Sequence, residues 1–228
     1  MQSISPSNRP LRAAARSSAL SRAQVEEIRS LLPPTTAFDV TFVETYGDLD
    51  RETSLRTLGR TDFFTREVDQ LVLSGECDFG IHSAKDLPEP LTKGLTLFAL
   101  TRGIDPRDAL VLRPGVTLDT LPPGSVIATS SERRIDAVKA LRQDFTFIDL
   151  RGTIEERLSM LEKGLADGVV IAEAALIRLK LDVNRIYLPG TTVAAQGQLA
   201  IVGLTARKQI LEKIFSCLDV KKSSTSSI

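Results

Sequence analysis

Polar side chains that can bind anions follow four of the strands expected in this chain. The guanidinium group of arginine binds a carboxylate or phosphate through two parallel hydrogen bonds, and hydroxyl groups add further donors. In open α/β sheets, ligands bind at the edge formed by the carboxyl ends of the strands. If the four strand ends converge, one cleft should take a ligand with several carboxylates or phosphates. The residues concerned are Arg16 and Ser18; Ser83 and Lys85; Thr129, Ser131, Arg133 and Arg134; and Arg151, Gly152 and Arg157.

Asp86 is the one carboxylate that we expect among these cations. A carboxylate in such surroundings does not bind an anion. It can stabilise a cationic intermediate or move a proton, or it can form a structural salt bridge to a neighbouring Arg or Lys. Taken alone, Lys85 and Asp86 are typical of a surface ion pair. The coincidence of cations at the other strand ends favours a functional role.

Strand and helix patterns alternate along most of the chain, which is typical of an α/β protein with mostly parallel sheets. A polar, glycine- and proline-rich break near Gly103 indicates two lobes. Residues 46–60 lack a clear period and are a candidate mobile loop over a cleft, and residues 190–201 are expected to be irregular. We expect strands at residues 11–15, 38–45, 78–83, 95–100, 125–128, 145–150, 169–172 and 185–188, and helices at 19–32, 62–74, 174–181 and 205–218, with two more beginning near 129 and 153.

The composition narrows the class of protein. The 228 residues are 42% hydrophobic and carry a formal net charge of zero, so no overall charge attracts nucleic acid or an anionic membrane. The two cysteines, Cys77 and Cys217, have no metal-ligand spacing and form no disulfide framework, which suits a reducing compartment. No apolar run can span a bilayer, and phosphate-binding glycine motifs are absent. We expect a monomeric, cytoplasmic protein without a metal site.

Seven short motifs, in this order, resemble the porphobilinogen deaminase (hydroxymethylbilane synthase) family, over nearly the whole chain. They are Arg16-x-Ser18-x-Leu20, Thr45-x-Gly47-Asp48, His82-Ser83-x-Lys85-Asp86-x-Pro88, Asp105-Pro106-Arg107-Asp108-Ala109, Thr129-Ser130-Ser131-x-Arg133-Arg134, Leu150-Arg151-Gly152 followed by Arg157-Leu158, and Gln196-Gly197.

The resemblance implies an enzyme that joins four porphobilinogen units head to tail, releasing ammonia and forming hydroxymethylbilane for tetrapyrrole (haem) biosynthesis. It implies a doubly wound α/β fold with two periplasmic-binding-protein-like lobes around a central cleft. It also implies a dipyrromethane cofactor bound covalently to a cysteine. Asp86 would be the catalytic carboxylate. The cations and hydroxyls named above, together with Arg178 and Gln196, would bind carboxylates of cofactor and substrate.

The chain departs from the family pattern near its C-terminal end. We expect lobe 1 to comprise residues 1–101 and 196–222, lobe 2 residues 102–195, and residues 223–228 to be a disordered tail. The family's third, smaller domain, which carries the cofactor cysteine, is expected to be absent. Neither cysteine matches the family motif, so the attachment residue is unknown and Cys217 is a weak candidate.

A second hypothesis remains open from the residues alone. The same two-lobed fold can serve as a receptor for a polycarboxylate anion, with no chemistry. Asp86 distinguishes the two hypotheses, because a purely binding protein has no use for a carboxylate among its cations, whereas the enzyme requires it.

Overall fold

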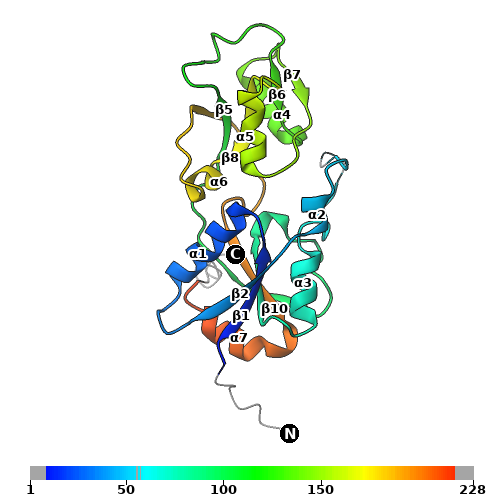
Figure 1. Ribbon diagram of the computed structural model, residues 1–228, viewed down its shortest axis with the longest axis vertical. Coiled ribbons are helices and arrows are strands. Elements are labelled where there is room, and N and C mark those ends of the chain that lie inside the picture. Colours follow the sequence, from blue (N-terminus) through cyan, green and yellow to red (C-terminus); the bar gives the residue numbers. More distant parts are fainter. Residues whose placement is uncertain (1–8, 55, 57, 219–228) are drawn as a thin grey trace, which may run out of the picture.

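The computed structural model describes residues 9–54, 56 and 58–218. The chain forms two lobes stacked along its long axis, and each lobe is built on one five-stranded sheet (Figure 1). The two-lobed α/β fold expected from the sequence is confirmed. The predicted tail at residues 223–228 lies outside the described residues.

Lobe 1 is the first sheet with its helices. Its strands are β1 (Leu11–Arg16), β2 (Phe38–Val43), β3 (Phe79–Ser83), β4 (Leu95–Leu100) and β10 (Leu199–Leu204), in the order β2-β1-β3-β10-β4. Its helices are α1 (Ala19–Leu31), α2 (Tyr46–Leu49), α3 (Arg66–Leu73) and α7 (Lys208–Phe215), with short 3₁₀ turns at Ala84–Asp86 and Thr205–Arg207.

Lobe 2 is the second sheet with its helices. Its strands are β5 (Asp108–Leu112), β6 (Val126–Ala128), β7 (Thr146–Ile148), β8 (Gly168–Ala172) and β9 (Arg185–Tyr187), in the order β7-β6-β8-β5-β9. Its helices are α4 (Glu132–Leu141), α5 (Ile154–Glu162) and α6 (Glu173–Arg178).

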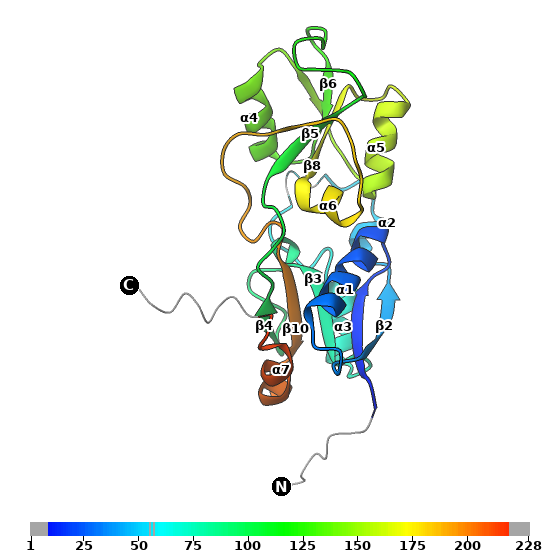
Figure 2. The ribbon, with the colours of Figure 1, turned by 90° about the vertical axis from the view of Figure 1, so that its left-hand side faces the viewer.

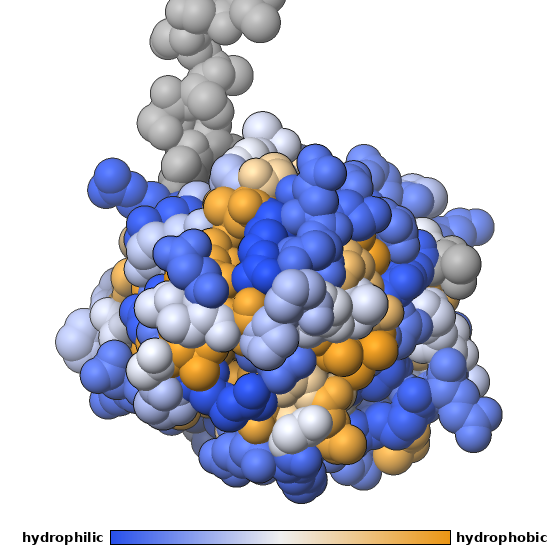
Figure 3. All heavy atoms as spheres, turned by 90° about the horizontal axis from the view of Figure 1, so that it is seen from above, coloured by the Kyte–Doolittle hydropathy of each residue, from blue (hydrophilic) through white to orange (hydrophobic). Residues whose placement is uncertain are grey.

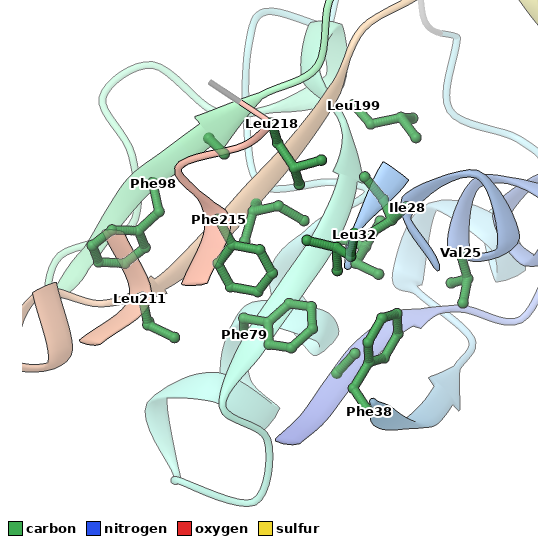
Figure 4. Close-up of a cluster of buried hydrophobic side chains, with 14 of the residues drawn as sticks. Val25, Ile28, Leu32, Phe38, Phe79, Phe98, Leu199, Leu211, Phe215 and Leu218 are labelled. Atoms are coloured by element: carbon green, nitrogen blue, oxygen red, sulfur yellow. The ribbon is translucent and has the colours of Figure 1, made fainter. Parts of the chain in front are cut away.

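Helices cover both faces of each sheet (Figure 2). Alternate residues of a strand point to opposite faces, so Ala13 and Ala15 of β1 join the core beneath α1 and α7, whereas Ala14 joins the core beneath α3. In the first of these cores, the rings of Phe79 and Phe215 pack edge to face with their centroids 4.8 Å apart (Figure 4). This packing holds the strands whose ends carry the candidate site.

The sheets are mixed rather than mostly parallel, because each contains one antiparallel strand that the sequence analysis did not predict. β10 runs antiparallel to both β3 and β4, and β5 runs antiparallel to both β8 and β9. Apart from Asp108 at the start of β5, both strands are apolar and buried on both faces, and such strands show no alternation that would reveal them. β10 takes in the last three residues of the segment expected to be irregular, which ends at Ile201.

Three further expectations need correction. The segment expected to be a loop contains the short helix α2. The helix expected from Asp62 begins only at Arg66, because Asp62 forms a turn and binds the Arg66 side chain instead. The apolar spacing of the predicted helix 205–218 places Ile210 on its inward side with Leu211 and Phe215, but Ile210 is 45% exposed, whereas the other two are buried.

Figure 3 looks onto the end of lobe 2. Hydrophilic side chains there separate several small apolar areas. Across the part of the chain that the structure describes, no helix is both long and apolar enough to cross a membrane.

Candidate active site

A cleft of about 320 Å³ lies where the two lobes meet. Lobe 1 contributes the end of β1, the first turns of α1 and the turn after β3, and lobe 2 contributes residues of α4, α5 and α6 and the end of β8. Strand ends from both lobes therefore converge on one cavity. The predicted site residues that line it are Arg16, Ser18, Ser83, Lys85, Asp86, Arg134, Arg151, Gly152 and Arg157.

Local structure delivers these side chains to the cleft. Ser18 is the N-cap of α1, and its hydroxyl accepts a hydrogen bond from the Ser21 backbone N–H at 3.2 Å. Thr153 and Glu156 form a capping box at the start of α5, and the N-cap Thr153 directly follows Gly152. Gly152 has φ of +94°, a conformation that favours glycine, and this turn brings the N-terminus of α5 to the cleft.

Arg16 and Arg134, which line the cleft, already bind carboxylates of the chain. Arg16 forms a salt bridge with Asp48 and its guanidinium lies 4.8 Å from the centroid of the Phe64 ring. Burial acts to raise the pKa of Asp48, but Arg16 and the hydrogen bonds from Thr45 together outweigh it, and the pKa falls below its usual range. Arg134 binds Asp108 at 2.6 Å, and the Asp108 side chain is only 1% exposed. A ligand would meet Arg16 in a neutral pair, whereas Arg134 shares Asp108 with Arg133, so that cluster keeps one positive charge.

Lys85 and Arg157 are different, because neither forms an ion pair with another described residue. The Arg157 Nε donates to the Gly152 carbonyl at 2.9 Å, and its terminal nitrogens have no hydrogen-bond partner among the described residues. Burial, together with the nearby Arg134 and Arg151, lowers the pKa of Arg157 to about 10. Burial likewise lowers the pKa of Lys85 to about 8, although the Asp86 carboxylate acts against it. These two cations lack a counter-ion that a ligand carboxylate could supply.

Asp86 ends the 3₁₀ turn after β3 and lies in the cleft with Lys85. Within the described part of the chain it forms no salt bridge or hydrogen bond through its side chain. The sequence predicted Asp86 as the one carboxylate among the cations, and this prediction is wrong. Glu44, Asp48 and Glu155 also line the cleft. Asp48 is paired with Arg16, and Glu44 and Glu155 are exposed, so Asp86 is the half-buried carboxylate that remains free.

Arg151 contacts the opposite lobe instead of presenting a free guanidinium. Its Nη2 donates to the Gly47 carbonyl at 3.1 Å and to the Asp50 carbonyl, both at α2. Near it, Arg51 of lobe 1 binds Glu156 of lobe 2 at 2.7 Å. The segment that includes α2 therefore bridges the two lobes beside the cleft.

Five predicted binding residues do not line the cleft. Thr129 is fully buried, and Ser131 is the N-cap of α4. Arg133 binds Asp108 at 2.5 Å and the Thr191 carbonyl at 3.0 Å. Arg178 binds Glu27, and the Gln196 amide donates to the Pro106 carbonyl at 2.6 Å and lines a second cavity between the two interlobe connections.

Neither cysteine lines the cleft. Cys77 is buried, which raises the pKa of its thiol, and Cys217 is exposed just beyond the end of α7. Among the described residues, no group of three or more His, Cys, Asp or Glu side chains is placed to hold a metal ion.

Several residues that line the cleft were not predicted from the sequence, of which Asp48, Phe64 and Arg51 matter most. Asp48 belongs to a motif that was noted, but its pairing with Arg16 depends on how α2 packs across the end of β1. Phe64 falls on the apolar side of the helix predicted at 62–74, which would turn it to the core; it is half-buried and stacks on Arg16 instead. The signal that could have identified Asp48 was its charge, because a carboxylate in a noted motif is a possible partner for one of the cations expected in the cleft.

The fold and the site together define the class of protein. It is a two-lobed α/β protein with a cation-lined cleft between its lobes. Residues 11–212 match the family model described as porphobilinogen deaminase, dipyromethane cofactor binding domain. A Chlamydia pneumoniae protein named "Probable porphobilinogen deaminase" is 44% identical over 197 residues, covering 85% of this chain and 83% of the relative. The chain therefore belongs to the porphobilinogen deaminase family.

Other relatives agree. Porphobilinogen deaminase of Caldicellulosiruptor saccharolyticus is 40% identical over 212 residues, which cover 90% of this chain and 73% of the relative. That of Roseiflexus sp. (strain RS-1) is 39% identical over 197 residues, covering 84% of this chain. The chain spans 65% of the length of this relative.

Solved structures support the fold. A periplasmic substrate-binding protein of an ABC transporter from Coxiella burnetii matches with a TM-score of 0.56 at 11% identity, over 91% of each chain. The Bordetella pertussis BvgS periplasmic VFT2 domain matches with a TM-score of 0.53 at 14% identity, over 95% of this chain and 88% of that chain. Both likenesses concern the fold alone.

Proposed function

We propose that the cleft holds dipyrromethane and the growing pyrrole chain, and that the protein catalyses stepwise head-to-tail condensation of porphobilinogen to hydroxymethylbilane. The observation that carries this proposal is the trio of Lys85, Arg157 and Asp86 in one cleft. Two cations without a counter-ion flank a free, half-buried carboxylate. This arrangement suits a ligand that carries carboxylates and also develops positive charge.

The residues present fit the dipyrromethane cofactor for which the matched domain is described. Each pyrrole ring carries an acetate and a propionate, and these carboxylates need cationic or hydrogen-bonding partners. Lys85 and Arg157 would hold the first carboxylates, and the Ser18 and Ser83 hydroxyls line the same cavity. When bound, the cofactor supplies the primer to which porphobilinogen units are added. No cysteine of the described residues lines the cleft, so the attachment residue stays unassigned.

Asp86 is the proposed catalytic residue. When ammonia leaves the aminomethyl carbon of porphobilinogen, positive charge develops on the substrate. A carboxylate held in a partly water-excluded cleft stabilises that charge, and it can accept hydrogen bonds from pyrrole N–H groups. Bond formation at the free carbon of the neighbouring ring then releases one proton, which Asp86 or solvent accepts.

The paired cations have a second proposed role. Arg16 and Arg134 are oriented by Asp48 and Asp108, and they can donate their remaining N–H groups to further carboxylates as the chain lengthens. Arg151 and Gly152 lie at the same wall. For Thr129, Ser131, Arg133, Arg178 and Gln196, ligand binding stays a prediction from the sequence, and their contacts give no support to it.

The remaining proposals concern the whole protein. We propose that lobe 1 comprises residues 1–101 and 196–222 and lobe 2 residues 102–195, since the sheets are divided in this way. One chain supplies both walls of the cleft, which supports a monomer that binds small molecules and needs neither nucleic acid nor a membrane. Two free cysteines support a cytoplasmic location.

The test begins with the purified protein. Intact mass and the colour reaction of pyrroles with an aldehyde reagent report bound dipyrromethane, and incubation with porphobilinogen reports hydroxymethylbilane. Bound dipyrromethane together with turnover supports the proposal. Folded protein that binds porphobilinogen without turning it over would be a receptor, and folded protein that does neither would contradict the proposed ligand class.

A further inference from the structure

Arg178, which the sequence analysis assigned to ligand binding, joins three parts of the molecule. Its Nε donates to Glu27 Oε2 at 2.7 Å, and its Nη2 donates to Glu27 Oε1 at 3.2 Å and to the Gly197 carbonyl at 2.8 Å. The side chains of Arg178 and Glu27 are only 5% and 17% exposed. This is the fork-to-fork geometry that gives arginine–carboxylate pairs their strength and fixed orientation.

The three partners belong to structurally separate elements. Glu27 lies on α1 of lobe 1, and Arg178 ends α6 of lobe 2. Gly197 lies in the segment that returns from lobe 2 to β10. α1 and α6 lie side by side at the junction of the lobes in both ribbon views (Figure 1 and Figure 2). A change in the angle between the lobes must therefore break or rearrange these bonds.

The same face of α1 also touches the cleft. Leu20, Gln24 and Glu27 are spaced by four and three residues, so they share one side of the helix. Leu20 packs against the core of lobe 2 and lines the cleft. Gln24 donates to the Ser83 hydroxyl at 2.8 Å, directly before the turn that carries Lys85 and Asp86. The position of α1 relative to lobe 2 thus sets the width of the cleft at its reactive end.

The interlobe connections meet at Gly197. Gly197 has φ of +85°, and a Cβ atom there would lie 2.8 Å from the Asp105 carbonyl oxygen of the other connection. The Ile104 N–H donates to the Gly197 carbonyl at 3.3 Å, so this carbonyl accepts from both the first connection and Arg178. The guanidinium of Arg178 consequently ties the two connections to α1.

We propose that Glu27 and Arg178 form an interlobe clamp that fixes the angle between the lobes and thereby positions the cleft. Arg178 is a positioning residue, because Glu27 and the Gly197 carbonyl hold its guanidinium. The clamp goes beyond the proposed function and does not depend on it, because it concerns the relative placement of the lobes without any ligand. It assigns a role to an arginine that the sequence pattern placed in the binding site.

The test measures an interlobe distance in the unliganded chain. Lys93 of lobe 1 and Asp119 of lobe 2 are both exposed, so Lys93→Cys and Asp119→Cys in a Cys217→Ser background accept a spin-label pair, while Cys77 is buried. Double electron–electron resonance then gives the distance distribution. Arg178→Lys cannot reproduce the fork to Glu27 and Gly197, and Glu27→Gln removes the charge while keeping the shape.

We expect at least one of these two variants to shift and broaden the distance distribution, by on the order of a few ångström. Arg113→Lys is the matched control, since Arg113 binds Asp167 at 2.9 Å and both residues lie within lobe 2. Its distribution should equal that of the parent. Unchanged distributions in both clamp variants would overturn the clamp, and so would an equal shift in the control.

Discussion

Lys85 should make carboxylate binding in the cleft strongly dependent on pH. Burial lowers the pKa of Lys85 to about 8, with Arg134 and Arg157 acting in the same direction and Asp86 and Asp108 acting against it. Only the ammonium form attracts a ligand carboxylate. Binding of an anion is therefore strongest below pH 8 and weakens as the pH rises through that value.

The size of the effect follows from the titration of one group. If only the protonated form binds, the apparent Kd is multiplied by one plus the ratio of neutral to charged Lys85. With a pKa of about 8, this gives roughly tenfold weaker binding at pH 9 than at pH 7. With an ordinary lysine pKa, the affinity would be almost constant over that range.

Isothermal titration calorimetry with porphobilinogen between pH 7 and pH 9 measures this ratio. Lys85→Arg keeps its charge throughout and should remove the loss of affinity. Lys85→Gln should bind weakly at both values, and its titration corrects for ionisation of porphobilinogen itself. Parent and Lys85→Arg proteins with the same pH dependence would refute the reasoning, because Lys85 would then not titrate in this range or would not contact the ligand.

Three other substitutions test the remaining contacts. Arg157→Leu should weaken porphobilinogen binding by roughly 10- to 100-fold, measured by calorimetry at pH 7, because a charge-assisted hydrogen bond is lost; unchanged affinity would exclude Arg157 from the site. Asp108→Asn should lower the free energy of unfolding by about 3 kcal/mol in urea denaturation, because Arg133 and Arg134 lose a buried counter-ion; a loss below 1 kcal/mol would show that the pair contributes little. Thr153→Ala should lower Tm by about 2–4 °C through loss of the α5 cap, and an unchanged Tm would contradict that role.

Much of the architecture could be predicted because its signals are local. The α1 stop at two prolines, the capping box of α5 and the apolar spacing of the helices are all readable from neighbouring residues. β5 and β10 were not predicted, because a strand that is buried on both faces shows no alternation of apolar and polar residues. Their antiparallel direction follows from the chain crossing between the lobes, which no local pattern records.

The site could be predicted as a set of strand ends but not as a set of contacts. Nine of the predicted residues line the cleft because parallel strands deliver their carboxyl ends to one edge. Whether a cation is free depends on salt bridges to residues that are distant in the sequence. Arg16 meets Asp48 only once lobe 1 has folded, and Arg178 meets Glu27 only once the two lobes lie together. The sequence therefore could not separate paired cations from the free Lys85 and Arg157.

The role of Asp86 is tested most directly by comparing turnover and binding in Asp86→Asn. Asparagine keeps the shape of the side chain and removes the charge that the account places beside the developing cation. Porphobilinogen turnover should fall by about 10²–10³-fold while porphobilinogen affinity is retained or improved. Asp119→Asn, on the exposed surface of lobe 2, is the matched control and should behave as the parent. An Asp86→Asn protein that forms hydroxymethylbilane at the parental rate would contradict the account.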